Sequence, residues 1–333
     1  MIETIYIEDN LGAHPRARRL LDRFPDARVI PCRHYTEVFN PSAQSFDLQK
    51  QKPSLILARK HGNLVLPVPE GFGIGDGPNY YFSHMLNCLY DCRYCFLQGM
   101  FRSAHYVLFV NFEDFEVAIN DVLACEHDKL PYFFSGYDCD SLALESLTGF
   151  VEHFVPFFAL RPEAILELRT KSVAISNLRR MTPSSNVVIA FSFTPAETAA
   201  AVEHGCPSIA QRIHAAAELA AGGWPIGIRL DPLLWYDDWR AGYSALIAML
   251  AKAIPTAALH SVSLGPLRFP SDMFKRIERM YPQDRLLNGP LARREKFVSY
   301  SEAREVQLLD FVEQRLVQAF PAINLSSCTL NAT

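Results

Sequence analysis

Apolar and polar residues follow two different periods along this chain, and the two periods alternate. Residues two apart line one face of a strand, whereas residues three and four apart line one face of a helix. Strands are predicted at residues 80–83, 106–111, 132–136, 165–171, 186–193, 225–231 and 260–265, and helices at 112–125, 142–158, 208–221 and 239–254, with a short helix ending at Arg180. This alternation predicts an α/β fold with a parallel sheet covered by helices.

The length of the alternating part predicts a barrel that does not close. The strand–helix units between residue 80 and Gly265 number about six, fewer than the eight of a complete barrel. We therefore predict a partial (β/α)6 TIM-like barrel over residues 76–270. A small N-terminal α/β segment (1–75) precedes it and ends in the glycine-rich loop at 71–78, and a C-terminal helical extension (271–333) follows it.

Composition narrows the class of protein. The 333 residues are 49% hydrophobic and 20% charged, as in globular proteins, and the formal net charge of -4 argues against indiscriminate nucleic-acid binding. Local basic clusters at 16–19, 179–180 and 293–296 and the aromatic run at 235–239 are candidate DNA contacts, although solvated faces and core packing would explain them as well. No apolar run has transmembrane length and no signal-peptide pattern opens the chain, so we expect a cytoplasmic protein without membrane contact.

Three cysteines directly after the strand at 80–83 carry the strongest chemical signal. Cys88, Cys92 and Cys95 have a C-x3-C-x2-C spacing. Cytosolic cysteines stay reduced, so thiols this close in sequence indicate a metal site and not disulfides. Iron–sulfur clusters usually have four cysteine ligands, and three ligands leave one iron open. We predict a 4Fe-4S cluster whose open iron binds a cofactor or a substrate.

Two simpler interpretations compete with the cluster. Zinc would also accept three thiolates, with Cys125 or His84 as a fourth ligand, but structural zinc sites favour paired C-x2-C knuckles and no second knuckle is present. Unrelated buried cysteines are the other alternative. Three cysteines within eight positions, in a chain that has only 8, make coincidence a poor explanation.

The cysteine loop resembles that of the radical S-adenosylmethionine superfamily. The longer run at 92–98, Cys-Arg-Tyr-Cys-Phe-Leu-Gln, is similar to the spore photoproduct lyase family. The similarity extends to 106–111, 140–148, 170–171, 191–192, 203–205, 268–269, to Arg212 and, in the leading segment, to Arg33 and His34. The resemblance implies S-adenosylmethionine as a second cofactor, which an electron from a flavodoxin or ferredoxin would cleave to a 5′-deoxyadenosyl radical. In that family the radical reverses a thymine photoproduct in DNA.

The resemblance also implies which strand ends would contact the cofactor. Ser135 and Gly136 follow the second barrel strand, where the superfamily's backbone meets the methionine amino group. Lys171 and Ser192 end the third and fourth strands and match cofactor contacts of the related lyases, although a solvated lysine and a capping serine would explain them equally well. Arg268, after the last strand, is a candidate for a phosphate or the cofactor carboxylate.

The final hydrogen transfer is where this chain departs from the family pattern. In the family, a cysteine after the second barrel strand donates the hydrogen atom, and two tyrosines flanking the third cluster cysteine relay it. Tyr94 matches the first tyrosine, but Phe96 replaces the second and has no hydroxyl. The donor position falls at Tyr137, with Cys139 two residues on, and we predict Tyr94, Tyr137 and Cys139 as the catalytic candidates.

Several alternatives stay open at this point. Cys139 donates after a local shift of the loop, or it is an inert thiol and Tyr137 donates its phenolic hydrogen; Cys328 is a more remote candidate. A third possibility is a radical reaction on another substrate that needs no such donor. A fourth, of another class, is a non-catalytic metal-binding or nucleic-acid-binding protein.

Overall fold

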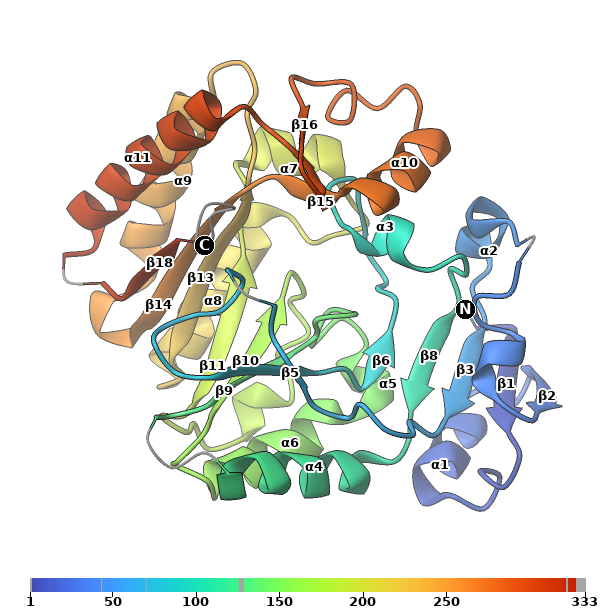
Figure 1. The fold of residues 1–333 in the computed structure, drawn as a ribbon. Helices are drawn as coiled ribbons and strands as arrows, with labels where there is room; N and C mark the ends of the chain where they lie inside the picture. Colours follow the sequence, from blue (N-terminus) through green and yellow to red (C-terminus); the bar gives the residue numbers. More distant parts are fainter. Residues whose placement is uncertain (1, 43, 70, 126–128, 322, 328–333) are drawn as a thin grey trace.

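A curled eight-stranded sheet forms the centre of the molecule (Figure 1). The computed structural model describes residues 2–327 except 43, 70, 126–128 and 322. Six strands of the sheet run parallel, in the order β14-β13-β11-β10-β9-β5: β5 (Asn79–Phe82), β9 (Tyr132–Ser135), β10 (Ile165–Thr170), β11 (Val187–Ser192), β13 (Ile226–Leu233) and β14 (Leu259–Pro266). The predicted partial barrel is confirmed. At its edges, β18 (Leu325–Ser327) extends the sheet in parallel and β4 (Leu66–Pro67) pairs antiparallel.

Helices cover the outer face of this sheet. They are α4 (Phe112–Cys125), α6 (Phe150–Ala159), α7 (Ala196–Val202), α8 (Ile209–Ala221), α9 (Trp239–Ala253) and α11 (Glu302–Ala319). The start of α8 follows local sequence rules: the Ser208 hydroxyl accepts from the Gln211 N–H, and the Gln211 side chain accepts from the Ser208 N–H. The long aromatic side chains of α6, including Phe154 and Phe158, are fully buried against the strands.

One predicted helix is wrong in its extent. Residues 142–158 were expected to form a single helix, but the structure has α5 (Glu145–Thr148) and α6 separated at Gly149. Gly149 has φ 63°, in the left-handed region that residues with a Cβ disfavour. The apolar period continues across the break, which explains why periodicity alone does not reveal it. The expected short helix ending at Arg180 is one 3-10 turn, Leu178–Arg180.

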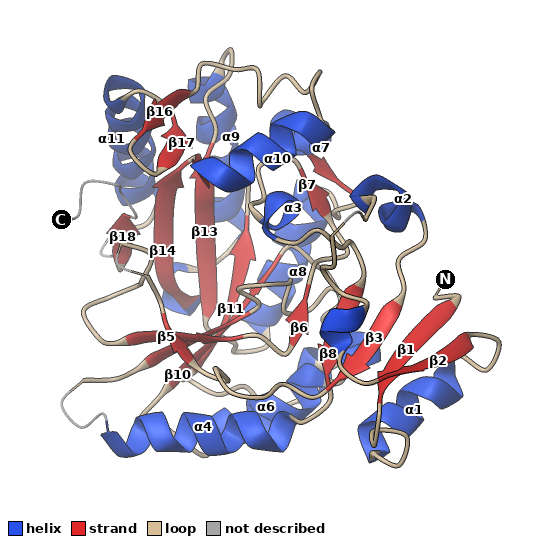
Figure 2. Ribbon diagram, turned by 45° about the vertical axis from the view of Figure 1, so that its right-hand side comes forward, coloured by secondary structure: helices blue, strands red, loops and turns tan. Residues whose placement is uncertain are grey.

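The N-terminal segment forms a second, five-stranded sheet in the order β2-β1-β3-β8-β6 (Figure 2). Its elements are β1 (Thr4–Glu8), α1 (Pro15–Arg23), β2 (Arg28–Cys32), a 3-10 turn (Tyr35–Glu37), α2 (Phe46–Gln51) and β3 (Leu55–Ala58), joined by β6 (Met85–Leu86) and β8 (Tyr106–Phe109). The strand expected at 106–111 therefore belongs to this sheet and not to the barrel, because β8 pairs with β3. The cysteine loop lies between β6 and β8, where the two sheets meet.

The C-terminal extension is helical with a small sheet added. Its elements are β15 (Arg268–Pro270), α10 (Ser271–Met280), β16 (Ala292–Arg294), β17 (Phe297–Ser299) and α11, and a 3-10 turn (Thr256–Ala258) precedes β14. The three strands pair antiparallel in the order β15-β17-β16. No helix in the described part of the chain is long and apolar enough to cross a membrane. The division at residues 75 and 270 stays a prediction.

Candidate active site

A cavity of about 600 Å³ opens at the carboxyl ends of the barrel strands, the end where parallel α/β folds place their sites. The structure brings all the predicted site residues to its wall: Cys88, Cys92, Cys95, Tyr94, Ser135, Gly136, Tyr137, Cys139, Lys171, Ser192 and Arg268. These residues come from the cysteine loop and the ends of β9, β10, β11 and β14. Their roles stay predictions.

The cysteine loop is shaped by local backbone bonds. Within it, β7 (Asp91–Cys92) pairs antiparallel with β12 (Glu203–His204), so that Cys92 lies opposite Glu203. The Cys95 N–H donates to the Cys92 carbonyl at 3.0 Å, which closes a turn before α3 (Leu97–Met100). The Tyr90 N–H donates to the Cys88 sulfur at 3.4 Å. Backbone donors to sulfur are the kind of contact that tunes iron–sulfur clusters.

The three thiols fit an iron–sulfur cluster. All are free. Burial raises the pKa of Cys95 to about 11 and that of Cys88 well above its usual value, so the thiolates of these two residues need a positive charge beside them. An iron cluster would supply that charge.

The zinc alternative fits less well. Two thiolates on one zinc lie within about 4.6 Å of each other, because each Zn–S bond is about 2.3 Å. Among the described residues, no three His, Cys, Asp or Glu side chains lie close enough to hold one ion. The proposed fourth ligands are also poorly placed: His84 is buried and stacked on Phe150 at 3.9 Å, and Cys125 is exposed at the end of α4.

Tyr94 is anchored by a carboxylate that the sequence did not single out as a site residue. Its buried hydroxyl donates to Glu203, which also pairs with the buried Arg212 and accepts from the Thr194 hydroxyl at 3.1 Å. Burial and the neighbouring Glu203 raise the pKa of Tyr94 well above its usual value. Tyr94 is therefore a fixed, protonated group at the edge of the cavity. The Lys171 ammonium lies 5.3 Å from the centre of its ring.

Tyr137 stands in an aromatic wall of the cavity. Its ring stacks on Tyr81 at 4.3 Å and lies 5.9 Å from the ring of Phe96. Burial raises the pKa of Tyr137 to about 12, so the phenol keeps its hydrogen at neutral pH. The ring of Phe96, which has no hydroxyl, thus faces a tyrosine that has one.

Cys139 is buried and lines the same cavity as Tyr137. The charges of Asp138, Asp140 and Lys60 act on its thiol. Burial raises the pKa of Cys139 well above the usual value, so this thiol stays protonated. Cys328 lies outside the described residues.

The loop after β9 is held by Asp140, which the sequence did not mark as a site residue. One carboxylate oxygen of Asp140 accepts from the N–H groups of Leu142 and Ala143 and from the Thr170 hydroxyl at 2.6 Å, and the other accepts from the Lys171 N–H at 2.7 Å. Asp140 thereby ties this loop to the end of β10. At the start of the loop, Gly136 has φ 77°, and a Cβ there would lie 2.9 Å from the Ser141 nitrogen.

The three remaining candidates lie at three strand ends. Lys171 is partly exposed; burial disfavours its ammonium, but the charges of Cys92 and Glu203 raise its pKa above the usual value. The Ser192 carbonyl accepts from Arg212 at 3.1 Å. Arg268 contacts Asp231 at 3.7 Å and lies over the Phe72 ring at 4.3 Å.

Comparison with known proteins assigns the family. The sequence model described as "Spore photoproduct lyase" matches residues 76–329. The chain belongs to the spore photoproduct lyase family. It is therefore a radical S-adenosylmethionine lyase, and the family implies S-adenosylmethionine and a 4Fe-4S cluster as cofactors and DNA repair as the process. The non-catalytic alternative is left without support.

Relatives and solved structures agree with this assignment. Spore photoproduct lyase of Bacillus subtilis is 23% identical over 316 residues, covering 92% of this chain and 90% of the relative, and that of Geobacillus sp. is 22% identical over 254 residues, covering 73% and 74%. A solved spore photoproduct lyase with a cysteine substitution has a TM-score of 0.87 at 19% identity, covering 98% of this chain and 99% of the other. Another, solved with bound S-adenosylmethionine and dinucleoside spore photoproduct, has a TM-score of 0.85 at 17% identity, with 98% of each chain covered. These structures establish the shared fold.

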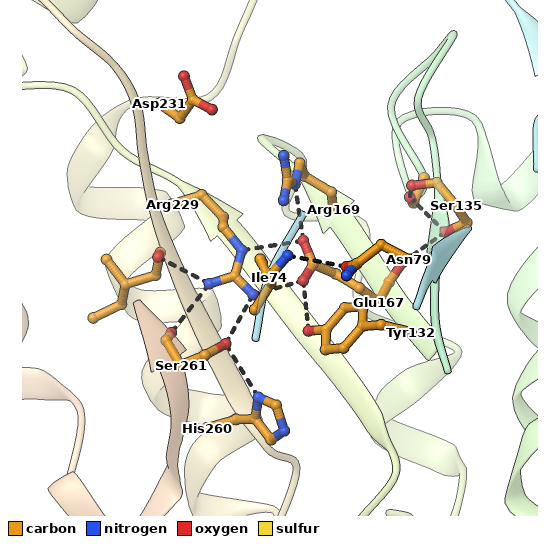
Figure 3. Close-up of polar contacts among 12 residues, drawn as sticks. Ile74, Asn79, Tyr132, Ser135, Glu167, Arg169, Arg229, Asp231, His260 and Ser261 are labelled. Atoms are coloured by element: carbon orange, nitrogen blue, oxygen red, sulfur yellow. Dashed lines mark hydrogen bonds and ion pairs between the residues drawn. The ribbon is translucent and has the colours of Figure 1, made fainter. Parts of the chain in front are cut away.

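Within this lyase fold, the floor of the barrel holds an ionic network that sequence reasoning missed (Figure 3). Glu167 and Arg229 are fully buried and joined through both carboxylate oxygens, at 3.1 and 2.6 Å. Tyr132 donates to Glu167 at 2.7 Å, and Arg169 donates from Nε at 2.8 Å. Charged residues inside apolar strands were the available signal, but a strand pattern does not tell which charges will meet.

The basic clusters and the aromatic run proposed as DNA contacts have partners of their own. Arg16 pairs with Glu113, Arg179 with Glu218 and Arg294 with Glu305. The indole rings of Trp235 and Trp239 lie 5.2 Å apart, and Trp239 packs on Phe311 of α11. None of these residues lines the cavity, so the aromatic run is part of the helix packing.

Proposed function

We propose that this protein reverses a thymine photoproduct in DNA, the spore photoproduct or a close analogue of it. The observation that carries the proposal is that one cavity collects the three cysteines, the proposed cofactor contacts and a tyrosine with a retained hydrogen. Relatives of similar length are spore photoproduct lyases, and one solved relative binds dinucleoside spore photoproduct. A lesion inside duplex DNA would have to be turned out of the helix to enter such a cavity.

In this proposal Cys88, Cys92 and Cys95 hold the 4Fe-4S cluster. When bound, cluster and cofactor supply a 5′-deoxyadenosyl radical, with one electron from a flavodoxin or ferredoxin as the proposed donor. The Lys171 ammonium and the Ser192 hydroxyl would bind the methionine carboxylate, and the backbone at Ser135 and Gly136 would bind its amino group. The aromatic wall formed by Phe96, Tyr137 and Phe134 excludes water from the reacting atoms.

Tyr137 is the proposed hydrogen donor. After the lesion has split, the remaining thymine radical takes the hydrogen atom of the phenol, which leaves a tyrosyl radical on Tyr137. One electron from the same reducing partner and one proton then restore the phenol. The thiol of Cys139 lines the same cavity and is the alternative donor.

A second candidate is the same radical chemistry on another substrate. The contact between Phe96 and Tyr137 favours it, because it changes the part of the cavity where family members relay the hydrogen. A different lesion or nucleoside would then fill the aromatic wall.

The deciding experiment is an anaerobic repair assay. Cluster-loaded protein is reduced and incubated with S-adenosylmethionine and dinucleoside spore photoproduct. We expect recovery of thymidine that depends on both cofactors, and loss of it in a Cys92→Ala variant that no longer carries the cluster. Release of 5′-deoxyadenosine without thymidine would refute the proposal and favour the second candidate.

A further inference from the structure

Arg169 lines the cavity and is connected to a buried ionic network through a single nitrogen, Nε. Its Nε donates to Glu167 at 2.8 Å, and Glu167 is in turn held by Arg229. Arg229 is fixed from the far side by the Ser261 carbonyl and hydroxyl, at 3.1 and 3.0 Å. Two arginines thus share one carboxylate, and the group has a net positive charge below the cavity.

The outer edge of the Arg169 guanidinium is available to a ligand. Within the described part of the chain, neither Nη atom donates to a protein acceptor, although the side chain is only 32% exposed and lines the cavity. Figure 3 shows the guanidinium above Glu167, on the side of Asp231. The Phe134 ring lies 5.2 Å from it, and the charges of Arg169 and Arg268 both act on Tyr137. Arg169 therefore presents two donors beside the proposed hydrogen donor.

Asp231 supplies a matching acceptor at the end of β13. Its carboxylate lines the same cavity, and its ion-pair partner among the described residues is Arg268 at 3.7 Å, a long contact that leaves acceptor capacity. The neighbouring Gly265 makes room for it, since a Cβ there would lie 2.7 Å from the nearer carboxylate oxygen. The cavity wall between β10 and β13 thus carries a hydrogen-bond donor, the Arg169 guanidinium, and an acceptor, the Asp231 carboxylate.

We propose that Arg169 and Asp231 are specificity-determining residues that read the edge of a pyrimidine in the lesion. Arg169 would donate to a ring carbonyl oxygen, and Asp231 would accept from the adjacent N3–H. Thymine presents this carbonyl–NH–carbonyl edge, and its saturated half in a photoproduct keeps it, so both halves qualify. The inference rests on the proposed function, because it names the part of the substrate that this wall recognises.

The residues around Arg169 favour a nucleobase as its ligand over a phosphate of the DNA or the carboxylate of the cofactor. Phe72, Phe96, Phe134 and Tyr137 line the cavity, and flat aromatic walls suit a nucleobase more than a phosphate. Arg169 is the second-to-last residue of β10, whereas Lys171 follows the strand. Lys171 lies beside Tyr94 of the cysteine loop and is the proposed partner of the cofactor carboxylate. The Arg169 guanidinium is fixed in orientation by its Nε contact, so its two Nη groups can donate in one plane to a planar acceptor such as a ring carbonyl.

The first test compares Arg169→Gln and Arg169→Lys with Arg161→Gln, a control on the outer face of the barrel where Arg161 lies over Phe157. For dinucleoside spore photoproduct, which has no phosphate, we expect the lesion Kd to rise about tenfold in Arg169→Gln, as for loss of a charged hydrogen bond. Arg169→Lys should recover only part of the affinity, and the Arg161→Gln control should bind the lesion as tightly as wild type. Binding of S-adenosylmethionine should not change in any variant.

The second test uses a dinucleoside lesion methylated at N3. Wild-type protein should bind it about tenfold more weakly than the unmethylated lesion, because Asp231 then faces a methyl group. In Asp231→Asn this preference should shrink to near unity. Gly265→Ala places a methyl group against the Asp231 carboxylate. It should reduce the preference for the unmethylated lesion, although the carboxylate is still present.

Three outcomes would overturn the inference. Weaker S-adenosylmethionine binding in Arg169→Gln with unchanged lesion binding would assign Arg169 to the cofactor carboxylate. A loss seen only with the phosphate-linked dinucleotide would assign it to the phosphodiester. An unchanged N3-methyl preference in Asp231→Asn would remove Asp231. Because each result is a ratio against wild-type lesion binding, failure of wild type to bind or repair the lesion would instead count against the proposed function.

Discussion

At the scale of single residues, the proposed reaction depends on which side chain in the cavity can donate a hydrogen atom. Phe96 removes one hydroxyl from the loop of the third cysteine, and Tyr137 places another in the facing wall, with the rings 5.9 Å apart. Burial raises the pKa of the Tyr137 phenol and of the Cys139 thiol, so both groups keep their hydrogen at neutral pH. In our proposal, Tyr137 supplies from the facing wall the hydroxyl that Phe96 lacks.

Replacing Tyr137 by Phe should therefore uncouple repair from cofactor cleavage. In Tyr137→Phe we expect thymidine recovery to fall on the order of 100-fold, the contribution typical of a positioned donor, while 5′-deoxyadenosine still forms. In D2O, the thymidine recovered by wild type should carry deuterium from the exchanged phenol. Tyr6→Phe, in the N-terminal sheet, is the matched control and should behave as wild type. Normal repair by Tyr137→Phe would remove this residue from the donor role.

Replacing Cys139 by Ala should lower the stability of the protein but leave repair intact. Cys139→Ala deletes a buried sulfur, so we expect a lower unfolding free energy, by about 1–2 kcal/mol. Repair and deuterium transfer should persist, because Tyr137 is the proposed donor. Urea unfolding and the repair assay on one preparation measure both effects, and loss of deuterium transfer in a stable, cluster-loaded variant would restore Cys139 as the donor.

At the scale of elements, two local features shape the barrel: a buried ion pair between strands and a glycine between helices. The Glu167–Arg229 pair connects β10 to β13 across β11, inside the barrel and below the cavity. Gly149 breaks a continuous apolar pattern, so that α6 can begin in a new direction. Each feature has a measurable signature in stability.

The buried pair should make stability depend on acid pH. Arg229 and Arg169 outweigh the cost of burying the carboxylate and lower the pKa of Glu167 from 4.5 to about 2. A lowered pKa adds stability above the unfolded value, and this stability is lost as pH falls from 4.5 toward 2; the shift corresponds to about 3 kcal/mol. Urea unfolding should show the difference between wild type and Glu167→Gln shrinking as pH falls from about 6 to 3. A difference that does not change with pH would contradict this account.

Gly149 should not tolerate a side chain. Gly149→Ala places a Cβ in a left-handed residue, 2.8 Å from an Arg19 nitrogen. We expect a loss of about 1–2 kcal/mol in unfolding free energy. Gly12→Ala is the control, because a Cβ there has nothing within 4 Å and the residue has no left-handed φ. Equal effects of the two substitutions would show that the break does not depend on glycine.

At the scale of the whole molecule, the two sheets share the cysteine loop. The loop leaves the N-terminal sheet at β6 and returns to it at β8, which pairs with β3. The second sheet thus holds both ends of the segment that carries the cluster ligands. The N-terminal segment therefore supports the active site from outside the barrel.

We therefore expect that a protein without residues 1–75 is insoluble or no longer unfolds cooperatively. The deletion uncovers the edge of β8, where Val107, Leu108 and Phe109 are buried in the intact chain. We expect aggregation or a strongly lowered Tm, and no cluster incorporation. Thermal unfolding followed by circular dichroism, beside the full chain, measures this. A soluble barrel with an intact cluster would show that 1–75 is an independent domain.

The sequence by itself determined what depends on short-range spacing. The six parallel strands, the three cysteines and the helices at α4, α8 and α9 follow from period, capping and ligand spacing, which act over a few residues. Parallel strands end on one side of a sheet, so even the meeting of Ser135, Lys171 and Ser192 was predictable.

Only the tertiary structure decided which distant groups become neighbours. The pairing of β8 with β3, the contact of Tyr94 with Glu203 and the Glu167–Arg229 pair are set by register and side-chain direction between elements far apart in sequence. A buried charge needs an oppositely charged partner, and the tertiary structure decides which residue that partner is. For this reason Arg169 and Asp231, ordinary charges in the sequence, become the open donor and acceptor of the cavity wall.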